Sequence, residues 1–185
     1  MTTFSSGDVE TDIMVDDPTS DEAKELYAYF GLAFYCSSVL EHGIANAILI
    51  LELLDGRGGA KTRREWEMLV DKHFEESFSQ TFGKLKNRLS RHNDRFQELK
   101  DVMSDIEKCV GERNFLAHHF WRENAMRWFT RTGREAMVQR LEQARELFSE
   151  TDKKLEVVTR PLAERHGITE DVRHYELGLI KKQAE

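Results

Sequence analysis

The sequence has few residues that interrupt helices. There are only two prolines, Pro18 and Pro161, among 185 residues, and most of the 11 glycines fall in or beside expected loops. Because proline and glycine are the residues that most weaken an α-helix, long stretches of this chain carry no strong helix breaker. The sequence therefore predicts an all-α fold, and a chain of this length fits a single domain.

Motifs for bound cofactors and metals are also missing. The two cysteines, Cys36 and Cys109, lie in separate segments and form neither a CxxC pair nor a zinc-binding pattern. The sequence contains no Walker motif, no GxGxxG and no GxSxG. The paired Glu-x-x-His motifs of a di-iron bundle are absent as well. These absences argue against a nucleotide hydrolase or a metal enzyme, and we expect neither a metal nor a cofactor.

Targeting and membrane signals are weak. No charged segment followed by an apolar run and a cleavage site opens the sequence. A bilayer span needs about 20 predominantly apolar residues. The most apolar window, residues 31–54, is interrupted by Ser37, Ser38, Glu41, His42, Asn46 and Glu52. We expect this window to be a core helix, and the protein to be cytoplasmic with no membrane partner.

The net charge of −7 comes from one end of the sequence. Residues 1–25 contain eight acidic residues and one lysine, and the other 160 residues hold 26 basic and 26 acidic residues. The remainder of the chain is therefore neutral overall. Acidity does not argue against nucleic-acid binding by that part.

The first helix is predicted from about residue 20 to residue 54. Thr19 and Glu22 have the spacing of a capping box at its start. Its apolar stripe steps alternately by four and three residues. The stripe runs through Leu26, Phe30, Ala33, Ser37, Leu40, Ile44, Ala47, Leu51 and Leu54. A second, largely apolar row makes this helix either central in a bundle or shared with a partner subunit.

Further helices are predicted over residues 62–74, 78–89, about 93 to just past 119, and 135–158. Thr132 and Glu135 are spaced as a second capping box before the last of these. The expected organisation is an acidic flexible segment over residues 1–19, a helical bundle over residues 20–160, and a short C-terminal helix or tail over residues 161–185 that packs on the bundle.

Residues 112–121 carry the most informative cluster. Arg113, Asn114, His118 and His119 fall within an otherwise apolar helical segment. Burying such groups is costly unless they are paired or used. Arginine can grip a phosphate with two donors and offset its developing charge, and histidine can move a proton near neutral pH. These side chains are what metal-free phosphodiester cleavage needs.

The order Arg-Asn-x-Leu-Ala-His over residues 113–118 resembles the R-x4-6-H motif of the HEPN superfamily, helical proteins that include many RNA-cleaving toxins. The resemblance covers roughly residues 20–160. It implies a bundle of four or five helices with the motif late in a long helix, and a homodimer that brings two motifs together. Many such proteins also carry an acid near the site on an early helix.

The resemblance implies Arg113, Asn114 and His118 as catalytic residues. His119 also satisfies the motif spacing, so the choice of histidine stays open, and Glu41 is the candidate for the supporting acid. Asn114 and His118, four residues apart, share one helix face. Arg113 lies about 140° from His118 in projection. Two copies of the helix facing each other across a two-fold axis would complete one composite site more easily than a single chain would.

The implied activity is metal-independent RNA cleavage. A histidine would take the proton from a ribose 2′-hydroxyl, which attacks the neighbouring phosphate while arginine stabilises the transition state. RNA is the expected substrate, and a cognate antitoxin protein is a further possible partner. Arginines and an aromatic ring just after the motif are candidate RNA contacts. They are Arg122, Arg127, Trp128, Arg131 and Arg134.

A non-catalytic interpretation stays open. Arginine and histidine near the end of a buried helix often satisfy backbone carbonyls or a nearby carboxylate, and His119 has acidic neighbours at Glu112 and Glu123. Basic runs are commonly solvated helix faces, and aromatic residues commonly form a bundle core. The alternative is therefore a dimeric HEPN-like scaffold that binds RNA, a nucleotide or a protein partner.

Overall fold

The computed structural model describes residues 16–52, 62–165 and 167–171, and within these ranges the chain is helical with no strand. The predicted all-α fold is thereby confirmed for this part of the chain. The helices in order are α1 (Ser20–Leu49), α2 (Arg63–Phe78), α3 (Phe82–Ser90), α4 (Glu98–His118), α5 (Phe120–Glu123), the 3₁₀ helix η2 (Arg127–Phe129) and α6 (Arg131–Arg165).

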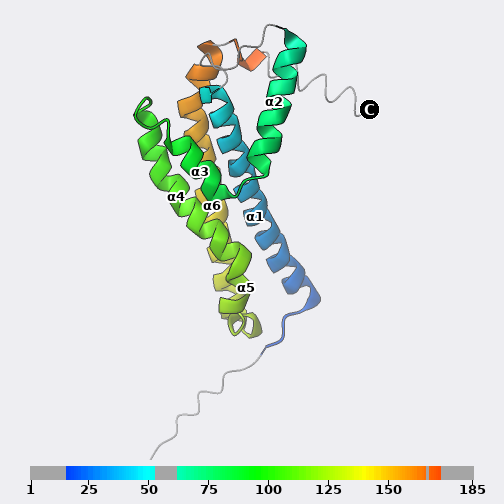
Figure 1. Ribbon diagram of the computed structural model, residues 1–185. Helices are drawn as coiled ribbons and strands as arrows, with labels where there is room; N and C mark the ends of the chain where they lie inside the picture. Colours follow the sequence, from blue (N-terminus) through cyan, green and yellow to red (C-terminus); the bar gives the residue numbers. More distant parts are fainter. Residues whose placement is uncertain (1–15, 53–61, 166, 172–185) are drawn as a thin grey trace, which may run out of the picture.

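The long helices α1, α4 and α6 form the body of the molecule (Figure 1). The first of these, α1, packs against α6 and also contacts α2, α3 and α4. The short helix α3 contacts both α1 and α4, and η2 packs against α6. The small helix α5 lies at the lower end of the bundle in Figure 1, and the last turns of α6 lie at the upper end.

The predicted stripe of α1 is the centre of the hydrophobic core. Leu26, Leu40 and Ile44 are at most 1 % exposed, and they pack in one cluster with residues of α6 such as Leu141 and Phe148. Each fully buried side chain of this kind contributes roughly 1.5–3 kcal/mol to folding. The stripe therefore fixes which face of α1 meets the other helices.

Helix α1 is the most apolar helix of the described chain by the membrane-span criteria of length and composition. Residues Ser20–Glu52 are long and apolar enough to cross a membrane by length and composition, and 39 % of their apolar window is buried in the structure. A core helix passes the same test. Contacts with α2, α3, α4 and α6 cover the buried stripe of α1, whereas Tyr27, Leu32, Tyr35 and Val39 stay exposed.

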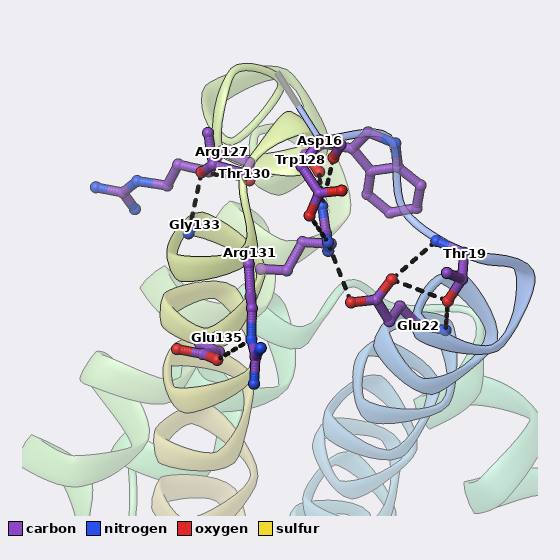
Figure 2. A network of polar contacts seen from close by, with 10 residues as sticks. Asp16, Thr19, Glu22, Arg127, Trp128, Thr130, Arg131, Gly133 and Glu135 are labelled. Atoms are coloured by element: carbon purple, nitrogen blue, oxygen red, sulfur yellow. Dashed lines mark hydrogen bonds and ion pairs between the residues drawn. The ribbon is translucent and has the colours of Figure 1, made fainter. Parts of the chain in front are cut away.

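The capping box predicted at the start of α1 is confirmed (Figure 2). The Glu22 amide donates to the Thr19 hydroxyl at 3.3 Å, and the Thr19 amide donates to the Glu22 carboxylate at 2.8 Å. A second such box forms at Thr62 and Glu65, at the start of α2. Each satisfies backbone donors that the first helical turn leaves unpaired.

The capping box predicted at Thr132 and Glu135 is wrong. Helix α6 begins earlier, after Thr130, whose backbone is extended and whose hydroxyl accepts from the Gly133 amide at 3.1 Å. A Cβ at Gly133 would lie 2.2 Å from the Arg127 carbonyl oxygen. This close approach of η2 puts the break in helical backbone at Thr130 (Figure 2). Glu135 instead pairs with Arg131 at 3.1 Å.

Other boundaries also differ from the expectation. Helix α6 continues through Pro161 to Arg165 instead of ending near residue 158. Pro161 is exposed, and Thr159 and Ala163 extend the buried stripe of α6 beyond Leu155, so packing supports the helix across the proline. Helix α4 begins at Glu98 rather than near residue 93, and α2 ends four residues later than predicted, at Phe78.

The two predicted flanking segments fall partly outside the described residues. Of the N-terminal segment, residues 16–19 lie against η2, where the Asp16 amide donates to the Phe129 carbonyl at 2.8 Å. The first five residues of the C-terminal segment belong to α6. Residues 1–15, the end of the first predicted helix at 53–54 and most of the predicted final helix lie outside the described residues.

Candidate functional site

The motif occupies the last turns of α4. This helix buries Ile106, Cys109 and Leu116 in the core, while Asn114 and His118 are exposed. Helix α4 ends at His118 because the backbone of His119 departs from helical geometry, with φ −125° and ψ −30°, before α5 begins. The motif therefore lies at a bend between two helices, with part of it facing solvent.

Arg113 faces α1 instead of solvent. Its Nε lies 3.5 Å from a carboxylate oxygen of Glu41, and its guanidinium carbon lies 5.7 Å from the centre of the Phe34 ring. The side chains of Arg113 and Glu41 are 29 % and 24 % exposed. At this distance the contact is an ion pair, and Nε has no hydrogen-bond acceptor within the described part of the chain. The structure thus brings Glu41 and the motif arginine together.

The environment of Glu41 disfavours its charge. Burial raises the pKa of this carboxyl above its usual value, and the positive charges of Arg113 and His42 oppose that shift without cancelling it. A single, loose partner compensates a partly buried carboxylate poorly. The pair is therefore held by packing between α1 and α4 as well as by charge.

Glu112 anchors the other side of α4. Its carboxylate pairs with Arg140 of α6, whose guanidinium carbon lies 5.4 Å from the centre of the Phe115 ring. The sequence does not indicate this pair, since no local pattern links positions 28 residues apart. Contacts to α1 through Arg113 and to α6 through Glu112 fix the rotation of α4. That rotation directs Asn114 and His118 outward.

Two imidazoles lie together at the bend. The ring centres of His118 and His119 are 6.4 Å apart, with an interplanar angle of 80°. An Arg122 Nη2 donates to the His119 Nδ1 at 2.9 Å, and a Glu123 oxygen lies 3.8 Å from the same nitrogen. Because a guanidinium can only donate, Nδ1 accepts and the ring proton is on Nε2. His118 carries the more exposed ring of the two.

One chain alone does not assemble every predicted catalytic residue. Among the described residues, Arg113 contacts Glu41 and Phe34 on the α1 side, whereas Asn114 and His118 lie on the exposed face of α4. This matches the separation that helical geometry requires between positions 113 and 118.

The residues after the motif divide into exposed and packed groups. Arg122 and Arg127 are exposed, and Arg127 donates to the Asn124 side chain at 3.0 Å. Arg131 is exposed beside Glu135 (Figure 2). Trp128 is half-buried, with its ring centre 5.7 Å from Tyr27 and 6.0 Å from Trp121. Its packing contacts explain its position without any ligand.

Arg134, a candidate RNA contact from the sequence, is buried and hydrogen-bonded within the fold. Its side chain is only 6 % exposed. The guanidinium donates to the Asp16 and Trp128 carbonyls at 2.8 and 3.0 Å, to the Asp16 carboxylate at 2.8 Å and to Glu22 at 3.1 Å. These four acceptors use both Nη groups of the buried guanidinium, the pair that would otherwise grip a phosphate. The acidic residues that precede and begin α1 occupy it instead.

Glu22 is stabilised as a carboxylate in this network. Hydrogen bonds from the Thr19 amide and hydroxyl, followed by that from Arg134, lower the pKa of Glu22 to about 2. Figure 2 shows Glu22 and Asp16 directed toward the start of α6, with Thr19 bonded to Glu22 at the start of α1. The sequence predicted the capping box of Thr19 and Glu22, but it did not indicate that Glu22 also binds Arg134.

Within the described ranges, no three His, Cys, Asp or Glu residues gather as metal ligands. The chemistry available at the end of α4 is that of two imidazoles, an amide and several guanidinium groups. No family model, curated protein or solved structure matches this chain.

Proposed function

We propose that this protein is a metal-independent RNA endonuclease of the HEPN type, acting as a homodimer in the cytoplasm. The observation that carries the proposal is the exposure of His118 and Asn114 on one face of a helix whose other contacts are fixed through Glu112 and Arg113. An exposed histidine on a rigid element is what proton transfer to a bound substrate requires.

The reaction begins at a ribose 2′-hydroxyl. His118 takes its proton as the 2′-oxygen attacks phosphorus. The bond between phosphorus and the 5′-oxygen of the next nucleotide breaks, and that oxygen takes up a proton from a protonated imidazole or from water. The products are a 2′,3′-cyclic phosphate and a 5′-hydroxyl. His119 is the second imidazole at this end of α4, and its Nδ1 is held by Arg122, so its Nε2 is the nitrogen left for substrate.

Arg113 supplies the phosphate clamp, contributed across the dimer to the His118 of the other copy. Its ion pair with Glu41 is through Nε, so the Nη groups can donate together to a phosphate. Arg122, Arg127 and Arg131 are exposed beside the motif and would bind neighbouring phosphates. Asn114, one turn before His118, would orient the histidine or the phosphate.

A dimeric, non-catalytic scaffold is the second candidate. It is favoured by the pairing of Arg113 with Glu41 and Phe34, because these contacts give the motif arginine a structural role. Such a scaffold would bind RNA, a nucleotide or a protein partner through the same surface. Polar pairs at helix contacts can serve to fix one arrangement of helices.

Incubation of the purified protein with structured and unstructured RNA in EDTA distinguishes the ribonuclease from the non-catalytic scaffold. We expect cleavage with cyclic phosphate ends by the wild type, none by the Arg113→Ala/His118→Ala variant, and no cleavage of DNA of the same sequence. His118→Ala alone should abolish cleavage while circular dichroism and sedimentation show unchanged helicity and dimerisation. Comparing it with His119→Ala identifies the active histidine.

Arg145→Ala is the matched control, since Arg145 is an exposed arginine on α6. It should cleave RNA at the wild-type rate. Intact RNA with the wild type and all variants, together with saturable RNA binding, would favour the scaffold. Loss of helicity in His118→Ala would also count against a catalytic role. If the protein is a toxin, a cognate antitoxin should cover the exposed face of α4.

A further inference from the structure

A cavity of about 460 Å³ is lined by residues of α1, α2 and the last turns of α6. These last turns of α6 lie at the end of the bundle away from α5 (Figure 1). Small-molecule sites commonly have volumes of roughly 300–1,000 Å³. The wall is mostly apolar and comes from all three helices and the segment after α6. Its apolar residues include Val39, Leu49, Ile50, Phe74, Leu155 and Ile168.

One carboxylate in this apolar wall has no partner among the residues that the structure describes. Asp152 of α6 is half-buried, and within the described ranges it forms no ion pair or hydrogen bond. It is seated against the backbone of α1, because a Cβ at Gly43 would lie 2.2 Å from its Oδ1. Burial, with a smaller effect from Glu156, raises the pKa of Asp152. A half-buried carboxylate of this kind gains from a cation brought to it.

The other charged groups in the wall do not supply that cation. Arg160 donates to Glu156 at 3.0 Å, so these two largely neutralise each other. The His42 ring packs on Phe78 with ring centres 4.3 Å apart. The lining as a whole therefore offers an apolar chamber with one excess negative charge at Asp152.

We propose that this cavity binds a small organic amine, with its ammonium group on Asp152 and its apolar body against the walls from α1, α2 and α6. A carboxylate ligand would be repelled by Asp152 and Glu156. A neutral apolar ligand would bury the Asp152 charge further without compensating it. Charge complementarity thus selects a monocation with an apolar group.

The amine site does not depend on the proposed ribonuclease. Its residues lie on α2, the second half of α1, the last turns of α6 and the segment after it, whereas His118 lies at the α4–α5 bend. Amine binding and RNA cleavage can therefore each fail alone.

The test uses the full chain and three matched probes that share an indole ring: tryptamine, the alcohol tryptophol and the anion indole-3-propionate. Calorimetry should give tryptamine an affinity at least ten times that of tryptophol, and no binding of the propionate. Tryptamine should also shift the methyl resonances of Leu155 and Ile168.

Asp152→Asn keeps the shape and removes the charge. It should abolish the preference for tryptamine over tryptophol, while Asp101→Asn, at an exposed position of α4, should retain it. Equal affinity of the wild type for the amine and the alcohol would overturn the proposal, and so would an absence of saturable tryptamine binding. Unchanged tryptamine affinity in Asp152→Asn would do the same. The probe comparison on the wild type needs no variant to fold.

Discussion

The start of α6 and the end of α4 each place an arginine against α1, but the two arginines are satisfied very differently. Arg134 is 6 % exposed and donates to four acceptors between 2.8 and 3.1 Å. Arg113 is 29 % exposed, has one carboxylate at 3.5 Å and leaves its Nε without an acceptor. A saturated guanidinium holds structure, whereas an undersatisfied one keeps donors for a ligand.

Lysine substitutions at positions 113 and 134 are the most direct test of this comparison between the two arginines. Arg113→Lys should lower RNA cleavage at least about a hundredfold, since lysine cannot donate as a planar fork, and should change the free energy of unfolding by less than about 1 kcal/mol. Arg134→Lys should do the opposite, destabilising the fold by about 2 kcal/mol through lost hydrogen bonds. Cleavage rates and urea unfolding measure the two effects.

The comparison fails if Arg134→Lys abolishes cleavage at a temperature where it is fully folded. It also fails if Arg113→Lys is the more destabilised of the two. Either result would mean that the degree of saturation of the guanidinium does not separate a structural arginine from a functional one.

The carboxylates facing the two arginines should respond oppositely to pH. The pKa of Glu22 is lowered to about 2 from its usual 4.5. Its contribution to stability is therefore present above about pH 5 and is lost as the pH falls toward 2. The melting temperature of Glu22→Gln should lie below that of the wild type at pH 6, and the gap should close toward pH 2. If the difference in melting temperature did not change with pH, ionisation of the Glu22 carboxylate would not be its cause.

Glu41 should show the smaller effect, with the reverse sign. Because burial raises its pKa in the folded protein, its charged form is disfavoured by folding, and stability rises as the pH falls through that raised value. Glu41→Gln should leave stability at pH 7 equal or higher, by less than about 1 kcal/mol. Urea unfolding at pH 7 measures it, and a clear loss of stability would show that the pair with Arg113 stabilises the fold.

Local sequence patterns predicted those features of the fold that depend on residues close together in the sequence. The alternating stripe through Leu26, Leu40 and Ile44 predicted the buried face of α1, because burial follows helical periodicity. Thr19 and Glu22 predicted the start of α1, because a capping box involves only neighbouring residues. Glu41, the supporting acid that the family resemblance implied, lies beside Arg113.

Tertiary contacts decided the features that were mispredicted or missed. Thr132 had the spacing of a cap, but the approach of η2 to Gly133 moved the start of α6 to Thr130. Arg134 resembled its exposed neighbours in sequence, and only folding brought Asp16 to it. The placement of Asp152 against Gly43 likewise joins two helices that are distant in sequence.

The network around Arg134 also bears on the order of folding. Its contact with Asp16 joins residues 118 positions apart. Forming this contact therefore costs the conformational entropy of closing a very long loop before the contact adds any stability. We expect contacts of this kind to form after the folding transition state, so that their loss accelerates unfolding more than it slows folding. The lifetime of the native state, more than the speed at which it forms, should then depend on where the chain meets the start of α6.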